Sequence, residues 1–220
     1  MTRYRTVVLA FLLVLLPSSL RAQSQMQFAI SGFGGVYVPA ADVLGGVLNI
    51  PGLGDVAATF GQGLGISVGG RLAIWPSRRL GIEAEAAYLS SDFDWDFLFP
   101  PDSGVLLPIS GDESANLTLA SLSVVLALIR PPLEPLVVYV SGGVGFVSRG
   151  GDGYDEFAFE ETDDVAAVFG LGLKYGISRG LWLRADVRDY LSSFKDEPFD
   201  SQLQNDFLIT AGLEVTVGGG

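Results

Sequence analysis

The stretch DFLITAGLEVTV, residues 206–217, alternates apolar side chains with small or polar ones. Its apolar parity contains Phe207, Ile209, Ala211, Leu213, Val215 and Val217. The other parity includes Thr210, Gly212, Glu214 and Thr216. Because successive side chains of a β-strand point to opposite sides, this period of two predicts a strand with one apolar face and one polar face.

Seven further stretches show the same alternation, at residues 26–38, 63–75, 80–91, 116–129, 136–148, 165–177 and 181–191. The connectors 76–79, 130–135 and 178–180 are short, whereas the connectors 39–62, 92–115, 149–164 and 192–205 are long. Strict alternation of connector lengths places all the tight turns at one end. The pattern predicts an all-β fold, an eight-stranded antiparallel up-and-down transmembrane β-barrel, with its tight turns and both termini in the periplasm.

A soluble barrel such as a lipocalin would turn its apolar face inward, and alternation alone fits that arrangement equally well. Three features favour the membrane. The polar face is rich in small residues, as a narrow lumen requires, and the strands are long enough to cross a bilayer at a tilt. Aromatic residues of the apolar parity also lie near strand ends, as in the interfacial girdles of membrane barrels. These aromatic residues are Phe28, Tyr88, Phe146, Tyr175 and Phe207.

The first residues have the features of a secretory signal peptide. Arg3 and Arg5 precede an apolar segment, residues 7–16, that is too short to span a bilayer. We therefore divide the chain into a signal peptide, residues 1–22, which directs secretion through the inner membrane, and an outer-membrane β-barrel domain, residues 23–220. The chain holds no cysteine, which excludes disulfides, thiolate metal sites and cysteine nucleophiles.

The chain resembles the small eight-stranded outer-membrane β-barrel proteins, the superfamily of the OmpA transmembrane domain and the OmpX-like proteins. The resemblance rests on the signal peptide, on SGGVGF at residues 141–146 and on LRADVRDY at residues 183–190. It implies residence in a bacterial outer membrane and insertion by the barrel-assembly machinery. The last strand departs from the family pattern, because it ends on Val217 and glycines rather than on a terminal aromatic residue.

The polar parity of the strands carries a balanced set of charges. Its members are Arg71, Glu83, Glu85, Lys174, Arg184, Asp186, Arg188 and Glu214. Buried charges must be paired to be tolerated, so these residues are predicted to form a charge network inside the lumen. Within it, Arg71 should lie near Glu83 or Glu85, and Arg184 near Glu214, because these residues stand on neighbouring strands. The network either fills the lumen as a plug or lines an ion path that opens when the pairs rearrange.

No enzymatic activity is expected. The lipid-modifying barrels of this size use a histidine base, and the chain has no histidine. The S-x-x-K match at Ser192–Lys195 is a single motif in a loop and is attributed to chance. No cofactor or metal site is predicted, although residues 150–157 match one copy of a calcium-binding nonapeptide that works as a stacked array. The net charge of −12 disfavours nucleic-acid binding.

The long connectors are acidic and contain an aromatic segment. The segment DFDWDF, residues 92–97, continues the period of two, so that Phe93, Trp95 and Phe97 share the parity of the lumen. These rings either cap the barrel mouth or offer a patch to a partner. We expect the barrel to contact outer-membrane lipid and lipopolysaccharide. The sequence does not identify an extracellular partner.

The sequence thus predicts an integral outer-membrane barrel with a plugged polar lumen, acidic extracellular loops and a structural or interaction role in the cell envelope. The alternative is a narrow porin-like channel for small solutes or ions.

Overall fold

The computed structural model describes residues 26–40, 44–51, 54–99, 109–129, 135–152, 163–194 and 202–218. The predicted signal peptide, residues 1–22, lies outside these residues. The described parts form ten β-strands. The strands are β1 (Gln27–Pro39), β2 (Leu44–Ile50), β3 (Gly54–Gln62), β4 (Gly65–Trp75), β5 (Leu80–Leu98), β6 (Ile109–Ile129), β7 (Leu136–Gly150), β8 (Asp163–Ser178), β9 (Leu181–Phe194) and β10 (Gln202–Gly218). None of the described segments contains a helix that is both long and apolar enough to cross a bilayer.

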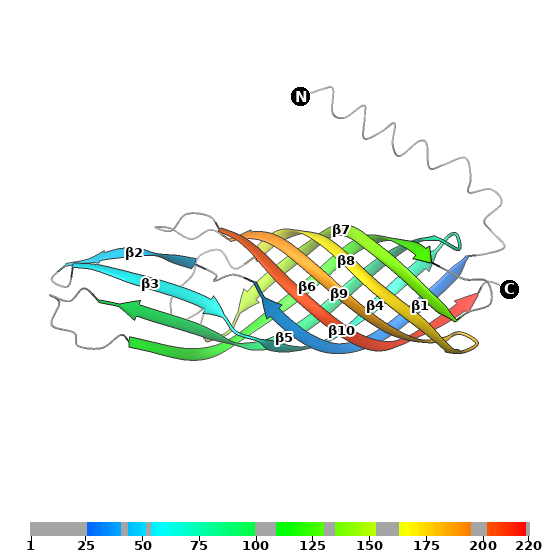
Figure 1. Ribbon diagram of the computed structural model, residues 1–220, viewed down its shortest axis with the longest axis horizontal. Coiled ribbons are helices and arrows are strands. Elements are labelled where there is room, and N and C mark those ends of the chain that lie inside the picture. Colours follow the sequence, from blue (N-terminus) through cyan, green and yellow to red (C-terminus); the bar gives the residue numbers. More distant parts are fainter. Residues whose placement is uncertain are drawn as a thin grey trace, which may run out of the picture.

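Eight of the strands close into an antiparallel ring (Figure 1). Around the ring the order is β1, β4, β5, β6, β7, β8, β9 and β10, and β10 pairs with β1 again. The predicted eight-stranded up-and-down barrel is therefore confirmed. Gln27 pairs with Gly218, so the described chain starts and stops at the end that holds the short turns 76–79 and 178–180. We call this the tight-turn end, and the opposite one the long-loop end.

The structure differs from the prediction in the first long connector, residues 39–62, because this segment contains the two additional strands β2 and β3. β5 pairs with β4 over Ile66–Ile74 and, farther along, with β3 over Ala57–Gln62. β6 follows β5 on the other side as far as the pair Phe97–Ile109. Together β2, β3 and the ends of β5 and β6 form a projecting sheet beyond the ring, visible at the left of Figure 1.

The ring exposes its apolar parity and buries its polar parity. On β4, Ile66, Val68 and Leu72 are 73%, 63% and 61% exposed, whereas Arg71 between them is 3% exposed. A soluble protein would bury the apolar set, because exposing it to water costs free energy in proportion to its area. The solvent of this outer face is therefore hydrocarbon, and the soluble-barrel alternative does not describe this chain.

β5 shows where the hydrocarbon ends. Its outward residues are apolar up to Tyr88 and then change to Ser90 and three exposed aspartates at positions 92, 94 and 96. Its inward residues change in the opposite sense, from Glu83 and Glu85 to Leu89 and Phe93, which are fully buried. The strand keeps its period of two while its apolar face moves from the outside to the inside, because the surrounding solvent changes from lipid to water.

Each of the three tryptophans lies across a glycine of the neighbouring strand. Gly111 is the register partner of Trp95, and Gly176 is the partner of Trp182. A Cβ atom built on Gly111 would lie 2.5 Å from the Trp95 ring, and one on Gly81 would lie 2.9 Å from the Trp75 ring. The glycines therefore provide the space that lets the indoles lie against the inner wall.

Two leucines test the boundary of the membrane span. Leu72 on β4 and Leu98 on the projecting sheet are both 61% exposed. Leu72→Arg should lower the free energy of unfolding in lipid vesicles by about 1–3 kcal/mol, because the guanidinium would face hydrocarbon between the midplane, where the cost is greatest, and the tight-turn interface, where it is small. Leu98→Arg is the matched control and should cost little, because its side chain faces water. Equal effects of the two substitutions in denaturant titrations would contradict the assignment of the lipid-facing surface.

Candidate functional site

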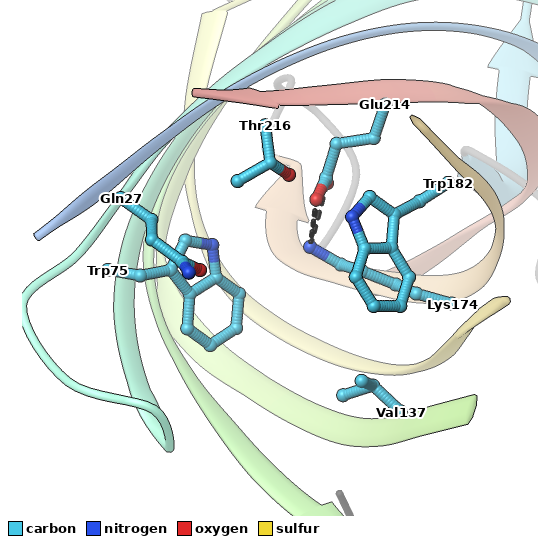
Figure 2. A pocket seen from close by; sticks show the side chains of 7 residues that line it. All are labelled: Gln27, Trp75, Val137, Lys174, Trp182, Glu214 and Thr216. Carbon is cyan, nitrogen blue, oxygen red and sulfur yellow. Dashed lines mark hydrogen bonds and ion pairs between the residues drawn. The ribbon is translucent and has the colours of Figure 1, made fainter. Parts of the chain in front are cut away.

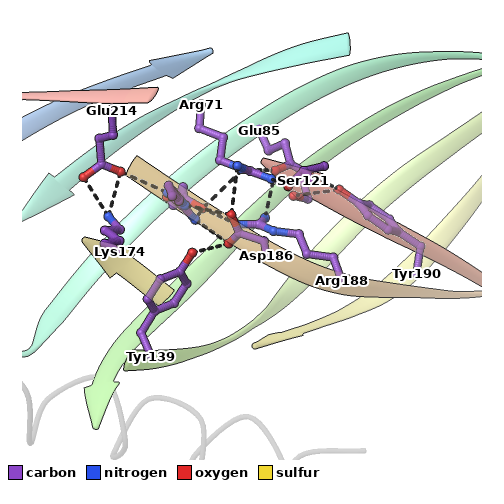
Figure 3. Close-up of polar contacts among 12 residues, drawn as sticks. Arg71, Glu85, Ser121, Tyr139, Lys174, Asp186, Arg188, Tyr190 and Glu214 are labelled. Carbon is purple, nitrogen blue, oxygen red and sulfur yellow. Dashed lines mark hydrogen bonds and ion pairs between the residues drawn. The ribbon is translucent and has the colours of Figure 1, made fainter. Parts of the chain in front are cut away.

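The eight charged residues predicted for the lumen come together in one cluster, which we call the central charge network (Figure 3). Arg71 comes from β4, Glu83 and Glu85 from β5, and Glu214 from β10. Lys174 comes from β8, and β9 provides Arg184, Asp186 and Arg188. Every member is at most 4% exposed. The four positive and four negative charges compensate one another inside the barrel.

Glu83 is the acceptor at the centre of the network. Arg184 donates from both terminal nitrogens to the two carboxylate oxygens of Glu83, with Nη2 at 2.9 Å from Oε1. Arg188, two inward positions farther along β9, donates to the same Oε1 atom. Two guanidinium groups therefore share one carboxylate. Arg184 bonds both of its oxygens in the paired geometry that makes charge-assisted hydrogen bonds strong.

Arg71 links the two sides of the barrel. Its Nε donates to Glu85, the register partner of Arg71 on β5. Its terminal nitrogens reach across the lumen to Asp186, at 3.1 Å, and to Thr210, at 2.9 Å. One arginine side chain therefore spans the interior, as expected in an eight-stranded barrel whose lumen is just wide enough for side chains.

Two like charges face each other within the network. Lys174 is the register partner of Arg184, which would be destabilising without an acceptor between them. Glu214 supplies that acceptor, because it receives hydrogen bonds from Lys174 at 2.7 Å and from Arg184 at 3.1 Å. The pairing of Arg184 with Glu214 thus resolves a repulsion that the β8–β9 register creates.

Two tyrosines, which the predicted set of charged residues does not include, complete the network. The Tyr139 hydroxyl donates to Asp186, and the Tyr190 hydroxyl donates to Glu85 at 2.6 Å. Tyr190 has the same parity as Arg184, Asp186 and Arg188, so the alternation itself carried the signal. Tyr190 satisfies the Glu85 oxygen that Arg71 does not bond, whereas Tyr139 shares an Asp186 oxygen with Arg184.

An apolar layer separates the central network from the long-loop end. It consists of Leu89, Leu117, Leu119, Val147, Val168 and Leu208, each 0% exposed. The alternation predicted an inward face of glycine, hydroxyl and charge, and it did not predict this layer. The leucine and valine side chains of the layer offer no polar partner to a dehydrated ion.

A second, smaller set of polar contacts lies on the long-loop side of this layer. Arg149 donates to Asp164 at 2.7 Å, to Asp206 at 2.8 Å and to Ser192 at 3.1 Å. The Tyr37 hydroxyl donates to Asp206. We call these five residues the rim network. Arg149 and Asp206 stand at strand ends. Each continues the inward parity of its strand, Arg149 that of Tyr139 and Asp206 that of Glu214, so the alternation carried this signal as well.

Aromatic side chains line a small pocket at the tight-turn end (Figure 2). The Lys174 ammonium lies 4.7 Å from the centre of the Trp75 ring and is bonded to Glu214. Trp182 lies beside it, and the space left between these side chains has a volume of ≈ 30 Å³. Such a cavity has room for water but not for an organic solute.

The aromatic segment of the projecting sheet turns inward. Phe93 packs against Phe60 of β3 with ring centres 6.1 Å apart, and Phe97 meets the same ring edge-on at 5.8 Å. Phe93 is fully buried and Trp95 and Phe97 are half-buried. Of the two interpretations left open by the sequence, packing above the barrel mouth fits these contacts better than an exposed patch. The nonapeptide segment lies outside the described residues from position 153 onward.

The outer face of the projecting sheet concentrates negative charge. Asp94 and Asp112 are register partners on β5 and β6. Partial burial, and then the neighbouring carboxylates of Asp92, Asp112 and Asp96, raise the pKa of Asp94 above its ordinary value. Like charges placed directly opposite each other destabilise a strand pair, so the repulsion between Asp94 and Asp112 lowers the stability of the projecting sheet.

Removal of the central acceptor gives the first test of the network. Glu83→Gln should lower the free energy of unfolding by about 3–5 kcal/mol, because Arg184 and Arg188 would lose their shared buried counter-charge. Glu113→Gln, on the projecting sheet, is the control and should have a small effect. The measurement is the unfolding midpoint in detergent or vesicles, followed on gels by the difference between heated and unheated protein. A Glu83→Gln variant as stable as the parent would refute the network as a stabilising element.

The repulsion on the projecting sheet predicts a pH dependence. Because the folded pKa of Asp94 is raised, the folded state binds more protons, and the sheet should become more stable as pH falls from neutral toward the ordinary carboxyl value of 3.8. Amide hydrogen-exchange protection factors over residues 92–97 measure this. Asp94→Asn should remove much of the dependence, whereas Asp55→Asn should leave it. Protection that decreases on acidification would contradict the prediction.

Comparisons with known proteins agree with this architecture. The family model described as the outer membrane protein beta-barrel domain matches residues 9–218. The crystal structure of the outer membrane protein OprG from Pseudomonas aeruginosa is similar, at 13% identity and a TM-score of 0.61, over 89% of this chain and 98% of that one. The solid-state NMR structure of the outer membrane protein AlkL in lipid bilayers is also similar, at 18% identity and a TM-score of 0.50, over 89% and 92%. No curated protein matches significantly. At such identities the two structures support the fold alone, and the family match decides the assignment: the chain belongs to the outer membrane protein β-barrel domain family.

Proposed function

We propose that this protein is a closed outer-membrane barrel whose role in the cell envelope is structural or interactive, with the lumen as a plug and the projecting sheet as the part that meets other molecules. The proposed orientation places the tight turns and both termini in the periplasm, after removal of the signal peptide. The projecting sheet then stands outside the cell, beside the lipopolysaccharide surface.

The proposal rests on the successive layers of side chains that fill the lumen from one end to the other. The tight-turn end is closed by Trp75, Trp182 and Lys174, and the middle is filled by the central charge network. Beyond the network comes the apolar layer, whose members are all inaccessible to solvent. A conducting path would have to break paired charges and cross an apolar layer, and each of these steps is unfavourable.

The proposal includes no enzymatic activity. Ser192, the serine of the S-x-x-K match, is buried and accepts a hydrogen bond from Arg149 as part of the rim network. This contact gives the hydroxyl a structural partner on the inner wall. Lys195, the other member of the match, lies outside the described residues.

The alternative function is a narrow channel for small solutes or ions. In its favour, charged side chains run through the half of the lumen nearest the tight-turn end, from the Lys174–Glu214 pair to Arg71 and Glu85. The apolar layer therefore distinguishes the two functions, because the leucine and valine side chains described there offer an ion no polar partner.

Conductance in planar bilayers tests the proposal. The parent protein should show no steady ohmic conductance. The triple variant Leu89→Ser, Leu119→Ser, Leu208→Ser should conduct measurably if the apolar layer is the main barrier. A matched triple variant on the outer wall, Leu64→Ser, Ile66→Ser, Leu72→Ser, should not conduct. Large, steady conductance of the parent would establish the channel function and overturn the closed barrel.

A further inference from the structure

The two ends of the barrel carry opposite charge. Among the described residues, the exposed basic side chains are Arg78, Arg79 and Arg179, and all of them lie in the tight turns. We call them the turn arginines. The exposed acidic side chains of the described residues, including Asp55, Asp94 and Asp112, lie at the long-loop end or on the projecting sheet. The molecule therefore presents a positive end and a negative end to the two sides of the membrane.

The turn arginines stand on ordered backbone. In the β4–β5 turn, the Ser77 hydroxyl accepts hydrogen bonds from the backbone N–H groups of Arg79, at 3.3 Å, and Leu80, at 3.0 Å. In the β8–β9 turn, Gly180 has a positive φ of 78°, and its carbonyl accepts the N–H of Thr216 at 2.7 Å. These bonds fix the turns that carry the arginines.

The turn arginines lie just past the last lipid-facing side chains. Ile74 and Ile82 are register partners at the base of the β4–β5 hairpin and are 44% and 48% exposed on the outer wall. On β8, Tyr175 and Ile177 face outward at 50% and 55% exposure, and Arg179 follows two positions later. A rise of roughly 3.3 Å per strand residue places these guanidinium groups within side-chain reach of the level where hydrocarbon ends.

We infer that the turn arginines bind the phosphate groups of anionic phospholipids in the leaflet at the tight-turn end. Guanidinium groups match phosphate oxygens in a paired geometry, and basic residues beside a membrane span attract anionic headgroups. The adjacent apolar side chains favour a phosphate that carries acyl chains over a free phosphate ion. With the proposed orientation this leaflet is the periplasmic one, and the contact fixes the depth of the barrel from that side.

Lipid selectivity in reconstituted vesicles tests the inference. The full-length mature protein is placed in phosphatidylcholine vesicles with a trace of spin-labelled phosphatidylglycerol or spin-labelled phosphatidylcholine, and electron paramagnetic resonance measures the fraction of each probe immobilised at the protein. Phosphatidylglycerol should associate at least about two-fold more strongly than phosphatidylcholine. The double variant Arg79→Gln, Arg179→Gln should lose this preference, and high salt should weaken it in the parent.

The controls separate the competing explanations. The variant Asp92→Asn, Asp94→Asn changes charge at the opposite end and should keep the preference for phosphatidylglycerol unchanged. If this variant raised the preference by as much as the arginine variant lowers it, the preference would reflect net charge alone, and the inference would be overturned. Inorganic phosphate should act no more strongly than chloride at equal ionic strength, and specific displacement by phosphate would overturn the lipid as the ligand. Equal association of both lipids with the parent would overturn it directly. Symmetric vesicles need neither the proposed orientation nor a closed lumen, so failure here leaves the proposed function standing.

Discussion

The central constraint on this structure is that the strands of the ring have hydrocarbon on one side and a lumen only as wide as their own side chains on the other. The outer face must be apolar, because water is absent there and nothing can solvate a polar group. The polar side chains therefore point inward, where bulk water is also scarce, and each charge needs a partner from another strand. Glu83 accepts from two arginines of β9, and Arg71 crosses the lumen to Asp186, because these are the counter-charges within reach.

The interior is consequently stratified rather than uniformly polar. Indoles and a lysine occupy the tight-turn end, paired charges fill the middle, leucine and valine side chains form the next layer, and the rim network follows. Each layer fills the lumen with groups of a different kind, namely indole rings, paired charges and apolar side chains. Under the proposed function, a rearrangement of the charged pairs alone would leave the apolar layer in place.

The surfaces of the barrel change character where the membrane ends. β5 is one continuous strand of 19 residues, yet its apolar side chains face outward near Ile82 and inward near Phe93. This exchange lets the same strand serve as a wall of the barrel and as part of a sheet that projects into water. It also leaves acidic groups on the outer face of the projecting sheet, far from the basic turns. The resulting charge difference between the two ends is available for contacts with different molecules on the two sides of the membrane.

The sequence by itself determined the eight-stranded ring, its lipid-facing parity and the membership of the central charge network, because a period of two assigns every strand residue to one of two faces. It did not reveal β2 and β3, which lie in a glycine-rich segment of a long connector. β3 forms by pairing along the extended β5, and β2 pairs in turn with β3. The order of the strands also predicted two pairs between neighbouring strands, Arg71 with Glu83 or Glu85 and Arg184 with Glu214, and both contacts are formed. It could not predict the pairs that cross the lumen. Parity says that Arg184 and Glu83 face inward, but contacts across the lumen depend on strand order, register and tilt, which bring together residues about a hundred positions apart. The apolar layer was also decided by the tertiary structure, because single inward leucines on separate strands become a barrier only when ring closure sets them at one level.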